Sequence, residues 1–195
     1  SVAREGAVMA WDGKIYAPGG YDGLTAIRDF QVYDPAADRW EKLPELPVKM
    51  SAHNGVAVKG RIYTFGDYEI LGRTAVYDIR KKTWNLLDLD YTPRRHQCVT
   101  LLDGDVFVTG GNVSSSPPFL AAIQRFPVSE LAAAERKAWK PGAEKPVAVI
   151  PPGAGLETFG LCDRPAPAIE MPLVDGKSWR LADQTGRVVV LDFWS

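Results

Sequence analysis

The chain has 195 residues, 24% of them charged, and a formal net charge of −1. This balance excludes the basic excess that is typical of proteins that bind nucleic acids or anionic membranes. The longest apolar runs, such as residues 188–191, are far shorter than the roughly 20 residues that a membrane-spanning helix needs. We therefore expect a chain with a packed core, no membrane span and no nucleic-acid partner.

Three segments of the chain repeat one another. In each, a turn glycine (Gly13, Gly60 or Gly104) is followed six residues later by a second glycine. The turn glycines are 47 and 44 residues apart, and the second glycines open the pairs Gly19–Gly20, Gly66–Asp67 and Gly110–Gly111. A period of this length predicts a repeat architecture, in which each unit buries its faces against its neighbours.

Each copy is predicted to contain four short strands. The first strands, residues 6–11, 55–58 and 98–102, lead into tight turns in which glycine supplies a positive φ. The second strands, residues 14–18, 61–65 and 105–109, end at the second glycines, where one backbone must approach another closely. The third and fourth strands carry the aromatic pairs Tyr33–Trp40 and Tyr77–Trp84, which we expect to pack between neighbouring units.

The third copy departs from this pattern. Tyr33 and Tyr77 each precede a tryptophan by seven residues, whereas Phe126 precedes Trp139 by thirteen. The additional residues predict a short helix that begins with Ser129 as its N-cap.

Residues 1–148 resemble the kelch-repeat family through the glycine pairs, the stretch VYDP at residues 32–35 and the spaced tryptophans. The resemblance implies a mainly β fold of about three kelch-type four-stranded propeller blades, at about residues 6–51, 53–97 and 98–148. Because propellers use about four to eight blades, three blades make an incomplete propeller. We expect further blades upstream, since residue 1 lies at the start of a strand; an oligomeric ring and an open fragment are the alternatives.

Two histidines are the candidate functional residues of the repeats. His53 and His96 each lie just before a predicted strand, at nearly the same place in copies two and three. With Arg95 they could line a propeller channel as ligands or bases. We favour a structural role, in which they satisfy loop backbone groups, because a position shared between repeats is usually architectural.

The other charged residues of the repeats are expected to be structural or solvated. Asp34 and Asp78 precede turns and should form Asx-type turns. Arg94 and Arg95, together with residues 80–82, should form a solvated basic surface. Cys98 and Cys162 lie in no CxxC or Cys/His cluster, so we expect unpaired thiols and no zinc. We therefore assign no catalytic, cofactor-binding or metal-binding residue.

Residues 140–172 are rich in proline and glycine and predict a linker at about 149–165. Residues 166–195 then resemble the opening of thioredoxin-like redoxins, through a turn at Asp175–Gly176 and the strand 188–193, which ends in Phe193–Trp194. In that family the reactive cysteine follows such a strand, so we expect this chain to stop short of it. The alternative is two strands of a further blade.

Three functions remain open at this point. The first is a fragment of a kelch–redoxin fusion, whose propeller binds protein partners through its loops and whose parent performs thiol–disulfide or peroxide chemistry. Such fusions imply a bacterial, extracytoplasmic setting. The second is a pure kelch interaction module, and the third is a kelch-type enzyme with a channel site. For this chain alone we predict no intrinsic catalysis and no cofactor.

Overall fold

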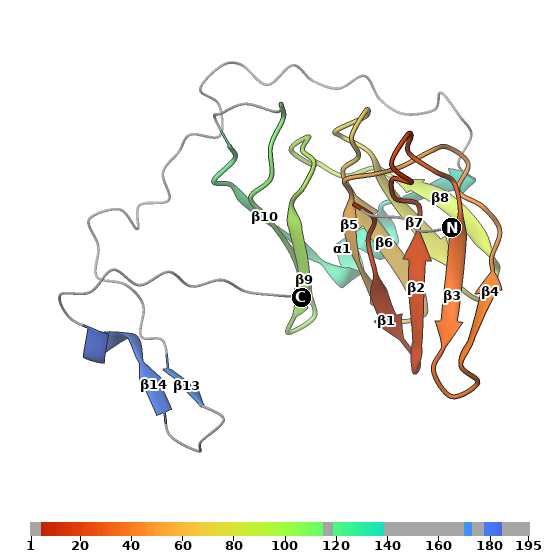
Figure 1. The fold of residues 1–195 in the computed structure, drawn as a ribbon. Coiled ribbons are helices and arrows are strands. Elements are labelled where there is room, and N and C mark those ends of the chain that lie inside the picture. Colours follow the sequence, from red (N-terminus) through yellow and green to blue (C-terminus); the bar gives the residue numbers. More distant parts are fainter. Residues whose placement is uncertain (1–4, 115–118, 139–169, 173–177, 185–195) are drawn as a thin grey trace. The chain divides into compact units, whose positions relative to one another are not determined.

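The structure is a computed structural model of the 195-residue chain, and it describes residues 5–114, 119–138, 170–172 and 178–184 (Figure 1). The chain divides into two compact units, residues 1–157 and 158–195. The linker predicted at 149–165 and the strand predicted at 188–193 lie outside the described residues.

The first two blades are antiparallel sheets that follow the predicted strand order. Blade one has the order β1-β2-β3-β4, and blade two contains β5, β6, β7 and β8 in the same sequence. The strands of blade one are β1 (Met9–Trp11), β2 (Lys14–Pro18), β3 (Phe30–Asp34) and β4 (Arg39–Lys42). Those of blade two are β5 (Asn54–Val58), β6 (Arg61–Phe65), β7 (Thr74–Asp78) and β8 (Thr83–Leu87).

The third blade differs from its predicted form. Its described sheet has three strands, β9 (Cys98–Leu102), β10 (Asp105–Thr109) and β11 (Ile123–Pro127), and the expected fourth strand is elsewhere. β12 (Glu135–Ala138) instead pairs with β8 and becomes the fifth strand of blade two. The ion pair of Arg61 with Glu135 and the hydrogen bond from Asn85 to Glu135 explain the preference of β12 for this edge.

Helix α1 (Val128–Ala133) connects β11 to β12. The predicted N-cap was wrong, because the helix begins one residue before Ser129 and Pro127 occupies the cap position without a side-chain hydrogen bond. Proline has no side-chain oxygen that could accept a hydrogen bond from the first-turn amides, so this helix begins without a side-chain cap. Val128 and Leu131 are buried in the core shared with blade two.

The turns between the first two strands of each blade explain the turn glycines. In all three blades the loop has two residues, and both have positive φ: 50° and 70° at Asp12–Gly13, 51° and 72° at Lys59–Gly60, and 51° and 85° at Asp103–Gly104. This is the geometry of a type I′ turn, whose twist matches that of the flanking strands. The prediction is therefore confirmed in each copy.

Two cores lie between the three blades, with β5 against both β1 and β9. The first core joins blades one and two around Phe30, whose ring centroid lies 4.8 Å from that of Tyr77 and 5.4 Å from that of Trp84. The second core joins blades two and three, and its Phe65 and Phe126 rings stack at 5.8 Å. The Tyr77–Trp84 pair thus packs between blades, as predicted.

The second unit has few described residues. β13 (Glu170–Pro172) and β14 (Ser178–Arg180) form an antiparallel hairpin, and a 3₁₀ helix, η1 (Leu181–Gln184), follows. The hairpin pairs the residues on either side of the predicted turn at Asp175–Gly176, which itself lies outside the described residues. In the part of the chain that the structure describes, no helix has the length and apolar character to cross a membrane.

Candidate protein-interaction site

The glycine pairs place one set of loops close to the chain that enters the next blade. Gly19 (φ 63°) and Gly111 (φ 91°) leave no room for a side chain, because a Cβ atom would lie 2.7 Å from the carbonyl oxygen of Met50 or Arg95. The amide of Gly20 donates to the Met50 carbonyl at 2.8 Å. The close approach predicted from the glycines is therefore confirmed, and it holds these loops against their neighbours.

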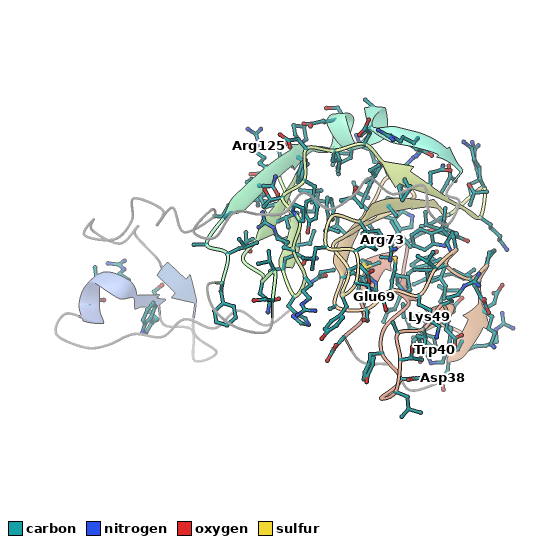
Figure 2. All side chains as sticks on the ribbon, turned by 90° about the horizontal axis from the view of Figure 1, so that it is seen from above. Asp38, Trp40, Lys49, Glu69, Arg73 and Arg125 are labelled. Atoms are coloured by element: carbon teal, nitrogen blue, oxygen red, sulfur yellow. The ribbon has the colours of Figure 1, made fainter. Side chains whose placement is uncertain are left out.

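A buried ion pair braces the loop between β6 and β7. Asp67, which replaces the second glycine in copy two, accepts hydrogen bonds from the Arg73 guanidinium at 2.5 Å, from the Ser51 amide at 3.1 Å and from the Ile70 amide at 3.2 Å. Both side chains are at least 94% buried. A buried carboxylate is tolerated when its charge is paired and its oxygens accept several hydrogen bonds. Figure 2 labels Arg73 together with Glu69 of the same loop.

A cluster of exposed and buried side chains, which we call the Tyr68 cluster (Tyr68, Arg95, His96 and Asn112), lies on this braced loop and the adjacent ones. The Arg95 guanidinium carbon lies 3.9 Å from the centroid of the Tyr68 ring, a cation–π contact. The rings of Tyr68 and His96 meet edge to face at 6.4 Å. The His96 Nδ1 lies 3.2 Å from the Asn112 Oδ1, and the backbones of Arg95 and Asn112 exchange two hydrogen bonds of 2.9 Å.

The Tyr68 cluster combines exposure with rigidity. Tyr68 is 46% exposed and His96 is exposed, while Arg95 is 7% exposed beneath them. The Tyr68 amide also donates to the Ser51 carbonyl at 2.9 Å, which fixes the loop. A fixed aromatic ring with polar neighbours is the kind of side chain that anchors protein interfaces, because little conformational entropy is lost on binding.

The two candidate histidines have different environments. His53 is buried and its Nε2 donates to the Pro18 carbonyl at 3.0 Å, while its Nδ1 has no hydrogen-bond partner. Burial lowers the pKa of His53 to about 4, so the ring is neutral near pH 7. His96 has a positive φ of 55° and an exposed ring. His53 therefore has the structural contact that we favoured, whereas His96 belongs to the Tyr68 cluster.

The repeat positions of the two histidines differ by one residue. His53 lies seven residues before the turn glycine Gly60 and His96 lies eight before Gly104, so the counterpart of His53 in copy three is Gln97. Gln97 is buried too, and its side-chain amide donates to the Phe65 carbonyl. Both buried side chains thus donate to the carbonyl of the last residue of a second strand, Pro18 of β2 or Phe65 of β6. Counting from the turn glycines would have shown this offset.

The predicted basic surface was wrong for two of its residues. Arg94 is completely buried, and its guanidinium donates to the carbonyls of Thr92, Gly110 and Ala122 and to the side chain of Gln124, at 2.9–3.1 Å. Arg95 is buried against Tyr68. Arg94 thus provides hydrogen-bond donors to carbonyls of the buried loop backbone, where water cannot provide them. Residues 80–82, by contrast, are exposed as expected.

The predicted Asx turns are present. The Asp34 Oδ1 accepts from the amides of Ala36 and Ala37, and the Asp78 Oδ1 accepts from the Lys81 amide at 2.9 Å. Asp34 also pairs with Lys14, and hydrogen bonds from that ammonium and from the turn amides lower the pKa of Asp34. These carboxylates are therefore engaged in turns.

The described part of the chain contains no candidate metal-binding site. No group of three His, Cys, Asp or Glu side chains there is arranged to hold a metal ion. Cys98 is exposed and has no disulfide partner. Cys162 lies outside the described residues.

Sheets of this kind, packed face to face with their first strands adjacent, are blades of a β-propeller. Comparison with known proteins identifies the type of blade. Residues 4–47 match the Kelch motif. The chain is 28% identical to Kelch-like protein 35 of Mus musculus over 112 residues, which are 55% of this chain and 19% of that protein. These similarities support a kelch β-propeller.

The names of two further relatives combine the kelch repeat with a second domain, an F-box or a BTB domain. The chain is 33% identical to an F-box/kelch-repeat protein of Arabidopsis thaliana over 88 residues, 42% of this chain and 23% of that protein. It is 30% identical to Kelch repeat and BTB domain-containing protein 8 of Danio rerio over 104 residues, 51% of this chain and 16% of that protein. The chain thus spans about a fifth of the length of the relatives that it matches.

Proposed function

We propose that the chain is a protein-interaction module, and that it binds its partner through the Tyr68 cluster. The observation that carries this proposal is the half-exposed Tyr68 ring, held over the buried Arg95 guanidinium at 3.9 Å. Tyrosine and arginine are enriched among the residues that dominate binding energy at interfaces. The kelch relatives support a binding role for the propeller in general.

The partner surface is expected to supply hydrogen-bond acceptors and an apolar side chain. Tyr68 offers a ring face and a hydroxyl, and His96 and Asn112 offer polar groups at the same loop surface. Because the buried Asp67–Arg73 pair fixes the loop that carries Tyr68, the site needs little ordering when the partner binds.

To test this proposal, peptides that bind the immobilised 195-residue chain are selected from a phage-display library. The dissociation constants of the selected peptides are then measured by calorimetry. Tyr68→Ala should raise their dissociation constants at least about tenfold, because truncating an interface anchor typically costs more than 1 kcal/mol. Leu24→Ala is the matched control, since Leu24 is 90% exposed and lies outside the cluster. Peptides that bind the Tyr68→Ala variant as tightly as the unchanged chain would contradict the proposal.

A second candidate concerns residues 166–195, which we propose to be the opening of a redoxin-like domain. The hairpin of β13 and β14, followed by η1, has the order of elements that the resemblance implies. The Kelch motif match covers none of these residues, and none of the relatives named above is a redoxin. Insulin reduction and peroxide turnover by the 195-residue chain should remain at background, because in redoxins the reactive cysteine follows the strand that corresponds to the one predicted at 188–193. Clear turnover would contradict this assignment.

A further inference from the structure

Positively charged side chains gather at one end of blade two, on two of its turns. One turn joins β5 to β6 and the other joins β7 to β8. The Ile79 amide donates to the Gly60 carbonyl at 3.1 Å, which holds the two turns side by side. We call their exposed cationic residues the basic turns (Lys59, Arg80, Lys81 and Lys82).

The repeat does not require positive charge at these positions. Blade one has Asp12 where blade two has Lys59, and the φ angles are 50° and 51°. It has Asp38 where blade two has Lys82, with φ angles of 46° and 56°. Blade three has Asp103 in its first turn, with a φ of 51°. Because aspartate adopts the same backbone geometry, the turns themselves do not explain the lysines.

Most of this charge has no partner in the described part of the chain. No described residue forms an ion pair with Lys59, Arg80 or Lys82. The Lys81 Nζ lies 3.7 Å from the Asp78 carboxylate, which is longer than a hydrogen bond. The basic turns therefore carry an excess of positive charge, in a chain whose formal net charge is −1.

We propose that the basic turns bind a short acidic segment of a partner protein. Lysine presents a compact charge on a flexible stem, so the basic turns can follow carboxylates that are spaced along a peptide. The Lys81 amide already donates to the Asp78 Oδ1 at 2.9 Å, and the Lys82 amide donates to the Asp78 carbonyl at 2.8 Å. An anion at this turn therefore meets side-chain donors, and not the converging backbone amides that hold a single phosphate.

The neighbouring blades favour a short segment over a long polyanion. β5 packs against β1 and β9, so the turn of Lys59 lies between the equivalent turns, which carry Asp12 and Asp103. A nucleic acid or an anionic membrane that extended over these blades would bring its phosphates close to the two carboxylates, and like charges repel. A short acidic segment avoids this repulsion.

The basic turns are separate from the Tyr68 cluster. β6 begins at Arg61, directly after the first basic turn, and it ends at Phe65, three residues before Tyr68. Five residues of a strand span about 17 Å, so the two surfaces lie at opposite ends of the blade. The acidic segment therefore binds independently of the partner that we propose for the Tyr68 cluster.

The first test measures the binding of fluorescent hexaglutamate and hexaglutamine peptides to the 195-residue chain by anisotropy. Hexaglutamate should bind at least about tenfold more tightly than hexaglutamine at about 20 mM salt. Its dissociation constant should rise at about 200 mM salt, because salt screens charge pairs that are exposed to solvent.

Variants then locate the site at about 100 mM salt, where charges more than about 10 Å apart are largely screened. Lys59→Asp with Lys82→Asp introduces the residue that blade one has at both positions, so the turns should keep their geometry. Each change removes an attraction and adds a repulsion, so this double variant should raise the hexaglutamate dissociation constant at least about tenfold. The matched control, Lys42→Asp with Lys49→Asp, changes the net charge equally at two exposed positions outside the basic turns. It should change the dissociation constant by less than about twofold, and Tyr68→Ala should leave it unchanged.

Circular dichroism melts should show that both double variants are folded. A further variant, Arg80→Gln with Lys81→Gln, leaves the positive-φ positions unchanged and should weaken hexaglutamate binding too. Equal binding of hexaglutamate and hexaglutamine, equal weakening by the two aspartate double variants, or loss of binding in Tyr68→Ala would each overturn the proposal. Tighter binding of hexathymidylate or of phosphatidylserine vesicles than of hexaglutamate would also overturn it, and would assign the basic turns to a nucleic acid or to a membrane.

Discussion

Buried polar side chains hold the loops of this protein together. Arg94 donates to three loop carbonyls, Gln97 donates to the Phe65 carbonyl and His53 donates to the Pro18 carbonyl. An unpaired buried carbonyl costs on the order of 1–3 kcal/mol, so each of these side chains contributes to stability through the backbone that it satisfies.

His53 should make stability depend on pH. The pKa of His53 is about 4 in the folded chain and about 6.5 when unfolded. Between these pH values the unfolded chain binds more protons than the folded chain. The contribution of neutral His53 to the free energy of unfolding is therefore fully present above about pH 6.5, and it is lost as the pH falls toward 4. The full difference is on the order of 3 kcal/mol.

The variant His53→Gln tests this origin of the pH dependence. Glutamine occupies the equivalent position as Gln97 and donates to the corresponding strand, so the hydrogen bond to Pro18 can be kept. Urea unfolding at pH 7 and pH 5 should show a smaller loss of stability on acidification in the variant than in the unchanged chain. An equal loss in both proteins would assign the pH dependence to other groups.

The functional residues were harder to predict than the positions of the strands. Arg94 and Arg95 have the charge and sequence neighbours of surface residues, and only the folded loops show that carbonyls and an aromatic ring surround them. Tyr68 was missed as a candidate. Its signal was present, because it directly follows the Gly66–Asp67 pair, as Tyr21 follows Gly19–Gly20.

At the scale of elements, the glycines of the repeat perform two distinct tasks. Gly13 ends a type I′ turn with open space around it, whereas Gly19 also has the Met50 carbonyl where a Cβ would lie. Both have positive φ, 70° and 63°, so an alanine at either position has a similar backbone cost.

The two alanine variants therefore separate steric crowding from backbone strain. Gly13→Ala should destabilise the chain by about 1–2 kcal/mol. Gly19→Ala should cost about 1–3 kcal/mol more, because the loop must move away from Met50. Chemical denaturation of the two variants measures the difference, and equal losses would show that the loops tolerate the displacement.

The strand pattern was largely predictable because glycine and aromatic spacing determine turns and cross-strand pairs locally. The second strands of all three blades have their predicted bounds, 14–18, 61–65 and 105–109. The failure concerns the fourth strand of copy three. Its residues were expected to pair with β11, but the choice between the edges of β8 and β11 depends on the distant Arg61 and Asn85, which no local pattern reveals.

At the scale of the whole molecule, stability depends on contacts between neighbouring blades. Phe30 is 1% exposed and contacts Tyr16, Tyr77 and Trp84, so it joins blade one to blade two. Removing it opens a cavity at that interface rather than inside a blade.

We expect Phe30→Ala to cost about 3–5 kcal/mol and to increase amide hydrogen exchange throughout blade one. The matched control is Phe119→Ala, since Phe119 is 57% exposed and its truncation should change stability by no more than about 0.5 kcal/mol. Denaturation and hydrogen exchange measure the two effects. Unchanged exchange in blade one would show that the blades are not coupled through Phe30.

The pairing of β12 with β8 also affects how the protein can be made. Leu87 of β8 leaves the ribosome long before its partner Glu135, and blade three is synthesised in between. At about 5–20 residues per second, the edge of β8 waits roughly 2 to 10 seconds for its partner. An unpaired strand edge is a template for pairing with other chains. During synthesis the vulnerable site is therefore in the middle of the array, in a blade whose own four strands are already complete.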